Sequence, residues 1–231
     1  MGVNPFWQED FFLTLQQICH RAEIVNKASY NIVEANELAI NLISLDQNAE
    51  ADSLIALQKT YQKNGLQLVH LWEDIWLTKR LQVLSRMRSF LDLNDRVHGR
   101  KTKINSVSVA ESKSFLEENH LQGYVNAKFN YGLFVGDQIV ALASFSGARP
   151  MKSKGENYKS AELVRFASKA GVTVVGGLGK LIKHFLEQHP MQDLMTYADR
   201  DWSLGKGYDK MGFQLSQSVT PIFFYFDIKT K

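Results

Sequence analysis

The stretch Val174-Val175-Gly176-Gly177-Leu178-Gly179-Lys180 decides how this sequence is interpreted, because a glycine-rich turn here runs directly into a helix. Apolar residues recur at helical spacing after the turn, namely Leu178, Leu181, Ile182, Phe185 and Leu186. Free N–H groups at a helix amino terminus bind anions, and the helix dipole adds positive charge there. The turn matches neither the phosphate-loop signature nor the dinucleotide fingerprint. A strand over 161–167, this turn and the helix are therefore typical of a phosphate-binding arrangement, with a ligand-free connection as the alternative.

Strands and helices alternate on both sides of the turn. Before it, a helix is expected over 109–119, and strands over 131–135 and 138–143 are joined at Gly136-Asp137, where a tight turn requires positive φ. Residues 150–158 are polar and predict a mobile loop. After the turn we expect a strand over 194–198, a short helix over 207–211 and a final strand over 222–226. This alternation predicts a mixed sheet with helices packed on it.

The first hundred residues follow a similar but smaller pattern. Helices are expected over 8–23, 49–63 and 75–91, a short helix or turn after the first of them, and strands over 38–43 and 66–71. The composition then turns basic and polar near residues 96–103, and we place a domain boundary there. The predicted fold class is α/β (α+β), with a smaller α/β domain over 1–100 and a larger domain over 101–231.

Composition restricts the class of protein. The chain has 231 residues and is 45% hydrophobic, which is ordinary for a globular protein. The single cysteine, Cys19, forms no internal disulfide and fits a reducing compartment. The amino terminus lacks the basic start and apolar run of a signal peptide, and no segment is long enough to span a bilayer. We therefore expect a cytoplasmic protein, and the six histidines show no metal-ligand spacing, so no metal site is predicted.

Positive charge is concentrated in one segment. The net charge is +3, yet residues 79–103 hold eight Lys or Arg against only Asp92 and Asp95. Closely spaced cations gain affinity for nucleic acid by displacing counterions from phosphates. The candidate nucleic-acid contacts are Arg86, Arg88, Arg96, Arg100, Lys101 and Lys103. A solvated helix face and strand edge is the alternative.

A second motif carries a family resemblance. Gly207-Tyr208-Asp209-Lys210-Met211-Gly212-Phe213, preceded by Tyr197-Ala198-Asp199, resembles the GNAT N-acyltransferase superfamily. The resemblance implies that the glycine turn binds the pyrophosphate of acyl-coenzyme A, with acetyl-coenzyme A as the simplest donor. Tyr208 would then act as the general acid that reprotonates the departing thiolate. The implied cofactor contacts are Gly176, Gly177, Leu178, Gly179 and Lys180. The family commonly has Gln or Arg where this chain has Val174.

Three stretches resemble a branch of that superfamily that contains the Mom DNA-modification protein of phages. They are Asn119-His120-Leu121-Gln122-Gly123, Glu162-Leu163-Val164-Arg165-Phe166-Ala167 and Thr196-Tyr197-Ala198-Asp199-Arg200-Asp201-Trp202-Ser203. The resemblance implies activity at Asp199 and Tyr208, with Asp199 as the general base for an amine nucleophile. The alternative for Asp199 is a cap on the next turn. Arg165 is either a paired structural arginine or a substrate contact, and His120 is either structural or part of the motif.

The first half resembles another class of protein. The stretch 65–76, from Gly65 to Trp76, is similar to the last core strand and helix of very-short-patch-repair-type nucleases, which precede the same carboxy-terminal domain in phage endonuclease-like proteins. These enzymes hold Mg²⁺ between carboxylates. Asn41 stands where an acid would be expected, and Glu34 and Asp46 lack the expected spacing. We therefore expect a degenerate, inactive nuclease domain.

Two hypotheses of function follow. The first is a GNAT-fold group transferase acting on an amine, with a nucleic-acid-linked amine as one option, in which Tyr208, Asp199 and the turn amides converge. The alternative is a catalytically inactive nucleic-acid-binding protein derived from a mobile-element endonuclease. Val174 favours the alternative, whereas the Tyr208 motif favours the transferase.

Overall fold

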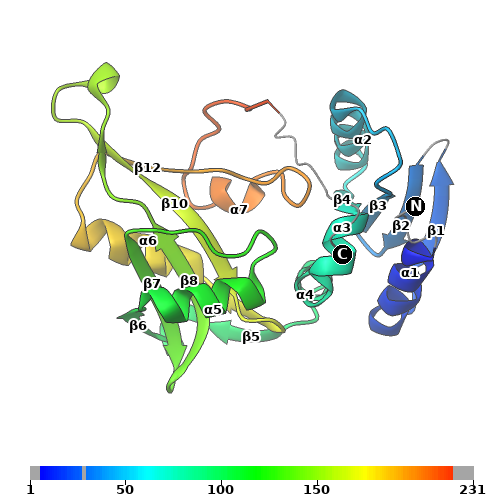
Figure 1. Ribbon diagram of the computed structural model, residues 1–231, viewed down its shortest axis with the longest axis horizontal. Helices are drawn as coiled ribbons and strands as arrows, with labels where there is room; N and C mark the ends of the chain where they lie inside the picture. Colours follow the sequence, from blue (N-terminus) through cyan, green and yellow to red (C-terminus); the bar gives the residue numbers. More distant parts are fainter. Residues whose placement is uncertain (1–5, 28–29, 221–231) are drawn as a thin grey trace. The chain divides into compact units, whose positions relative to one another are not determined.

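The computed structural model describes residues 6–27 and 30–220, which form two compact units (Figure 1). The first unit contains Met1–Leu84 and Asp199–Lys231, and the second contains Ser85–Ala198. The sequence-based boundary near residue 100 stays a prediction. The strand expected over 222–226 lies outside the described residues.

The first unit is built on a four-stranded sheet in the order β1-β2-β3-β4. Its strands are β1 (Glu23–Lys27), β2 (Tyr30–Ala35), β3 (Leu38–Ile43) and β4 (Gln67–Trp72). The first three strands are antiparallel, and β4 runs parallel to β3. Every residue of β3 is buried, as its apolar run predicts for a central strand. The strands predicted over 38–43 and 66–71 are confirmed, whereas β1 and β2 were not predicted.

Helices α1 (Trp7–Ile18), α2 (Ala51–Lys63), α3 (Glu73–Thr78) and α7 (Lys206–Asp209) belong to this unit, and α4 (Arg80–Phe90) begins in it and ends in the second. Two predictions need correction. The first helix ends at Ile18, because residues from Glu23 onward form a strand. The single helix expected over 75–91 is broken at Lys79, whose φ of −129° is not helical. Among the described residues, no helix combines the length and the apolarity needed to cross a bilayer.

The second unit contains a six-stranded sheet, in which five strands follow the order β12-β10-β8-β7-β6 and β9 pairs with β10. The strands are β6 (Lys103–Ser106), β7 (Phe129–Val135), β8 (Gln138–Phe145), β9 (Arg149–Pro150), β10 (Lys159–Ser168) and β12 (Asp193–Thr196). Within the described residues of this sheet, only β10 and β12 pair in parallel. The sheet is therefore mixed, as the sequence predicts.

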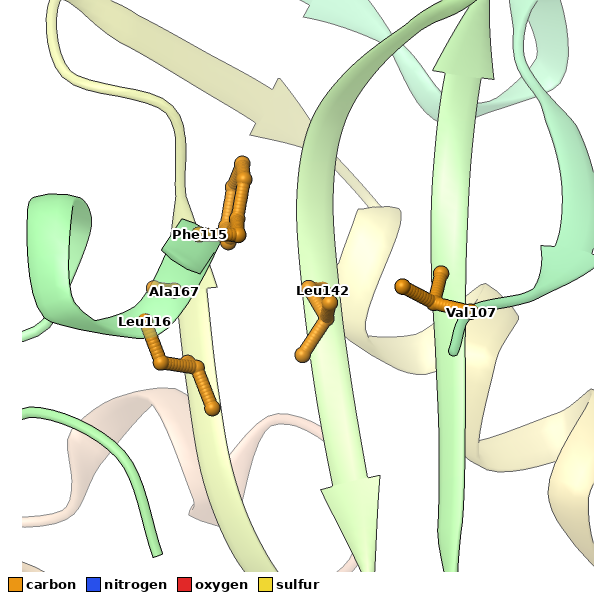
Figure 2. Close-up of a cluster of buried hydrophobic side chains, with 5 residues drawn as sticks. All are labelled: Val107, Phe115, Leu116, Leu142 and Ala167. Atoms are coloured by element: carbon orange, nitrogen blue, oxygen red, sulfur yellow. The ribbon is translucent and has the colours of Figure 1, made fainter. Parts of the chain in front are cut away.

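Helices α5 (Val109–Asn119) and α6 (Gly177–Gln188) cover opposite faces of this sheet (Figure 1). On one face, Phe115 and Leu116 of α5 pack with Leu142 of β8 and Ala167 of β10 (Figure 2). On the other face, the Phe185 ring of α6 stacks on Phe145 at 4.1 Å between ring centroids. Alternation along β8 thus gives each helix its own apolar surface.

A separate pair of strands supports the glycine turn. Strand β11 (Val172–Val175) pairs in parallel with β5 (Asp95–His98), and the 3-10 turn η1 (Gly99–Lys101) follows β5. A second 3-10 turn, η2 (Lys152–Lys154), lies in the segment expected to be a mobile loop. Neither β5 nor β11 was predicted. The strand that leads into the glycine turn is β11, and not the longer strand expected over 161–167.

Candidate functional site

The glycine turn has the backbone geometry of an open helix amino terminus. Gly176 has a left-handed φ of 71° and precedes α6, whose start receives no hydrogen bond from a capping side chain. A Cβ atom on Gly177 would lie 2.8 Å from Val174 Cγ1 and 3.0 Å from Leu133 Cδ1, so only glycine fits there. The first N–H groups of α6 therefore have no partner within the helix and are suited to an anion.

Two cations lie next to this turn. The register of β5 and β11 pairs His98 with Val175, which sets η1 beside the turn. The approach is close, since a Cβ atom on Gly99 would lie 3.1 Å from the Val175 carbonyl oxygen and 3.4 Å from Gly176. Arg100 and Lys101 are exposed, and they follow directly in η1. Two residues that we predicted as nucleic-acid contacts thus belong to the neighbourhood of the predicted cofactor turn.

Lys180, a predicted cofactor contact, has an evident structural role. Its Nζ donates to the Gly99 carbonyl at 2.9 Å, to the Thr102 carbonyl, and to Thr102 Oγ1 at 3.3 Å. An ammonium group has three N–H donors, so these contacts use all of them. Lys180 fixes η1 against α6, and a contact with a cofactor stays a prediction.

Strand β10 has an open edge near the middle of the sheet. Strand β12 pairs only with Ser160–Leu163, and Thr196 Oγ1 donates to the Leu163 carbonyl at 2.9 Å where the two strands part. Beyond this point, no strand of the described chain pairs with β10 on that side. The register with β8 also shifts between Leu163 and Arg165, which leaves Val164 as a bulge.

Asp199 caps a turn. Its Oδ1 accepts the N–H of Asp201 at 3.1 Å, and its carbonyl oxygen accepts the N–H groups of Trp202 and Ser203. These are the contacts of the capping alternative. Tyr208 lies in α7 with its ring against Phe213, 5.5 Å between centroids in an edge-to-face arrangement. Both predicted catalytic residues belong to the first unit and the glycine turn to the second, so their convergence stays a prediction.

Asp201 is the most perturbed carboxyl group of the described chain, and no feature of the sequence singled it out from its neighbours. Burial, followed by the nearby Asp199 carboxylate, raises its pKa to about 6, although a hydrogen bond from Trp72 favours ionisation. The Trp72 Nε1 donates to its Oδ2 at 3.0 Å, and its carbonyl oxygen accepts the His70 N–H at 2.9 Å. The loop is thereby fixed to β4.

The other predicted nucleic-acid contacts are partly engaged locally. Arg96 forms an ion pair with Asp92 at 2.5 Å, Arg88 donates to the Leu93 carbonyl at 3.1 Å, and the Arg86 guanidinium lies over the Phe90 ring at 4.9 Å. Lys103 is exposed on strand β6. Arg100, Lys101 and Lys103 are therefore the cations best placed to meet an external anion.

The expected nuclease position is occupied by a neutral pair. Asn41 and His70 are buried register partners on β3 and β4, and Asn41 Nδ2 lies 3.2 Å from His70 Nδ1. Glu34 accepts a hydrogen bond from the Tyr61 hydroxyl at 3.0 Å. Over residues 6–27 and 30–220, no group of three or more His, Cys, Asp or Glu side chains is arranged to hold a metal ion.

Comparison with known proteins gives likenesses in backbone only. A transcriptional regulator from Bacillus halodurans C-125 aligns at TM-score 0.44 and 10% identity, over 53% of this chain and 99% of its own. The ribosomal-protein-alanine N-acetyltransferase of Brucella melitensis biovar Abortus 2308 aligns at TM-score 0.40 and 14% identity, over 53% and 99%. A GNAT family acetyltransferase of Streptococcus pneumoniae TIGR4 aligns at TM-score 0.39 and 15% identity, over 55% and 99%.

No model of a known protein family and no curated protein sequence matches the chain. At identities of 15% or less and TM-scores below 0.5, the three structural likenesses assign neither a family nor an activity to this chain.

Proposed function

We propose that the protein is a group transferase of the GNAT type, which binds an acyl-coenzyme A at the glycine turn and transfers the acyl group to an amine. The observation that carries the proposal is the uncapped start of α6 with Arg100 and Lys101 beside it. The turn amides of Gly176–Gly179 would bind the pyrophosphate, whereas the Lys180 N–H already donates to the Gly176 carbonyl. The absence of a side chain at Gly177 lets the backbone approach the pyrophosphate.

The two cations of η1 compensate for Val174, which stands where the GNAT superfamily commonly has Gln or Arg. Val174 supplies no charge at the start of the turn, and its side chain is buried against Gly177. Arg100 and Lys101 come from a segment that precedes the sheet in the chain, and their N–H donors take the place of those of the missing Gln or Arg. When bound, the cofactor supplies an activated thioester, and the chain supplies its binding and the movement of protons.

Calorimetric titration with acetyl-coenzyme A tests this proposal. The double substitution Arg100→Gln and Lys101→Gln removes both cations, and we expect about tenfold weaker binding or more, since a charge-assisted contact is worth about 1.5–3 kcal/mol. The matched control is Lys113→Gln with Lys183→Gln, two exposed cations of α5 and α6. Equal affinity of the wild type and the double variant, or no binding by the wild type, contradicts the proposal.

Asp199 and Tyr208 remain the proposed proton acceptor and proton donor. A positioned general acid or base contributes about 10²–10⁴ in rate. Tyr208→Phe and Asp199→Asn should each lower kcat by at least about a hundredfold, while the affinity for acetyl-coenzyme A stays unchanged. Full activity in either variant would remove that residue from the mechanism. Asp199→Ser retains a capping group, and it therefore separates lost chemistry from a loosened turn.

A second candidate is supported by the charge of the second unit. It holds sixteen Lys and Arg residues against ten Asp and Glu residues, whereas the rest of the chain is net negative. We propose as the alternative a catalytically inactive nucleic-acid-binding protein, related to the Mom-like and nuclease lineages that the sequence resembles. DNA binding that weakens steeply with salt, without affinity for acetyl-coenzyme A, supports this alternative over the transferase.

A further inference from the structure

A row of polar residues crosses the second sheet on the face that α5 covers. The register pairs Asn130 of β7 with Ser144 of β8, and Ser144 with Arg165 of β10. The adjacent row on the same face, Gly132, Leu142 and Ala167, is apolar. Ser144 is fully buried and donates to Asn130 Oδ1 at 2.7 Å. The sheet thus changes from apolar to polar within two residues of each strand.

Arg165 ends this row, and no carboxylate of the described residues forms an ion pair with it. Its Nε donates to the Gly123 carbonyl at 3.3 Å, and its Nη1 donates to the Val164 carbonyl at 2.9 Å. Burial lowers the pKa of Arg165, and the Glu162 carboxylate partly opposes that shift. A half-buried cation without a counterion is unfavourable by itself.

Glu162 points to the same face as Arg165, although it does not pair with it. Its N–H donates to Ser146 Oγ at 2.9 Å, and its carbonyl accepts the Ser146 N–H, which fixes its backbone. Leu163 pairs with Phe145 and Arg165 with Ser144, so the bulge at Val164 places Glu162 and Arg165 on the side opposite to Leu163. An anionic and a cationic side chain therefore flank the bulge, both half-buried and not joined by an ion pair.

We propose that Glu162 and Arg165 bind a zwitterionic group, a small molecule or chain terminus that carries an ammonium and a carboxylate. The free edge of the Arg165 guanidinium matches a carboxylate in two-point geometry, and Glu162 matches the ammonium. The bulge also marks the place where β12 leaves β10, at the open edge described above. The ligand's role as the acyl acceptor rests on the proposed function, whereas its binding does not.

Nuclear magnetic resonance of the full chain tests the binding directly. The arginine Nε–H signal of Arg165 is assigned by its loss in Arg165→Lys, and it is followed during titration with glycine, sodium acetate or methylammonium chloride at constant ionic strength and pH 7. We expect a saturable shift with glycine in the range of about 1–10 mM, and binding at least about fivefold weaker with either single-charge probe. A linear response with all three probes overturns the proposal.

Substitutions of Arg165 and Glu162 test the contribution of each charge to glycine binding. Arg165→Lys keeps the charge but loses the planar fork, and we expect about tenfold weaker glycine binding, monitored through the backbone signals of β10. Glu162→Gln should remove the preference for glycine over acetate. This variant keeps the proposal testable if Arg165→Lys fails to fold. Arg149→Gln, an exposed residue of β9, is the control for charge. A preference for glycine that persists in Glu162→Gln overturns the proposal.

Titration of the same variants with acetyl-coenzyme A separates this proposal from the proposed function. Cofactor affinity should be unchanged in both variants, because neither residue lies in the glycine turn. Glycine binding without cofactor binding contradicts the transferase and retains the zwitterion site. Cofactor binding without glycine binding contradicts the zwitterion site and retains the transferase.

Discussion

At the scale of single residues, His70 and Asp201 show how burial sets proton affinity in opposite directions within one unit. Burial lowers the pKa of His70 to about 4 and raises the pKa of Asp201 to about 6. In both cases the low-dielectric surroundings favour the neutral form. His70 can therefore accept from Asn41 Nδ2 through Nδ1 and donate through Nε2 to the Leu54 carbonyl at 3.2 Å. Ionisation of the two groups therefore changes the stability of the folded protein in opposite directions as pH rises.

Asp201→Asn should stabilise the first unit above pH 6 and have little effect near pH 4. The pKa of Asp201 in the folded protein is higher than the ordinary value of 3.8, so the folded state binds more protons and stability falls as pH rises through about 6. The amide keeps an acceptor for Trp72 and removes the buried charge. We expect a gain of up to about 3 kcal/mol at pH 8.

Denaturant unfolding followed by tryptophan fluorescence measures this gain, because all four tryptophans, Trp7, Trp72, Trp76 and Trp202, belong to the first unit. Asp137→Asn in the hairpin turn of the second unit is the control. A gain that does not depend on pH would show that Asp201 is not the titrating group.

His70→Gln should give a difference profile of the opposite sign. The folded pKa of about 4 lies below the ordinary 6.5, so wild-type stability is lost as pH falls from about 6.5 through 4. The variant is less stable than the wild type at pH 7, and its deficit should shrink on acidification by up to about 1.4 kcal/mol per pH unit. The same fluorescence assay between pH 4 and 7 measures the profile. A deficit that is constant over this range would exclude His70 as an acid-sensitive group.

At the scale of elements, η1 and α6 are joined through one side chain. Lys180→Met removes three hydrogen bonds from Nζ and leaves the Gly99 and Thr102 carbonyls without this partner. We expect a loss of about 2–3 kcal/mol in the second unit, because these bonds are charge-assisted and partly buried. Hydrogen exchange of the α6 amides should accelerate accordingly. Lys183→Met, whose Nζ lies 3.9 Å from Glu187 on the exposed side of α6, should change little.

Elements with a strong local signal could be predicted from the sequence. Helix α5 was predicted over 109–119, and both of its ends are confirmed. The structure shows that Ser108 and Glu111 form a capping box at its start, which is a local signal. The hairpin of β7 and β8 was located from Gly136, whose φ of 58° the turn requires. Strand β3 was evident as an apolar run that only Asn41 interrupts. In each case the residues that determine the element lie within it or directly next to it in the chain.

Elements whose signal depends on distant partners could not be predicted. Strands β5 and β11 are each four residues long, which is too short for a clear periodicity. They pair with each other although they lie far apart in the chain. The helix breaks at Lys79 although the apolar stripe in the sequence continues across this residue. On either side of it, Trp76 and Arg80 both donate to the Asp10 carboxylate of α1. Strands β1 and β2 did carry a signal, since Ile24, Val25, Ile32 and Val33 are β-branched. We had expected a short helix or turn after the first helix instead.

The candidate site was predicted only in part, because some of its features depend on local signals and others on distant partners. The glycine turn was visible because glycines before a helical stripe are local. The position of Arg100 and Lys101 beside it follows from the pairing of β5 with β11, and the Glu162 and Arg165 arrangement follows from a bulge that only the register with β8 defines. The charge of each residue was known from the sequence, and the position of each relative to the others was not.

At the scale of the whole molecule, charge is divided between the units, with +6 on Ser85–Ala198 and −3 on the remainder. Such a division favours binding of polyanions by one unit. If Arg100, Lys101 and Lys103 contact phosphates, binding of a short DNA duplex should weaken with salt, and each contact contributes about −0.9 to the slope of log K against log salt concentration. Changing all three to Gln should then reduce the slope by about 2.7.

Changing Lys113, Lys152 and Lys183 to Gln removes the same charge at exposed positions of the same unit. An equal loss of slope in both triple variants would show binding by overall charge, and a loss confined to the first would show a localised surface. That surface shares Arg100 and Lys101 with the proposed cofactor turn. Acetyl-coenzyme A should therefore compete with DNA if both bind, and the failure of saturating cofactor to displace a bound duplex would separate the two surfaces.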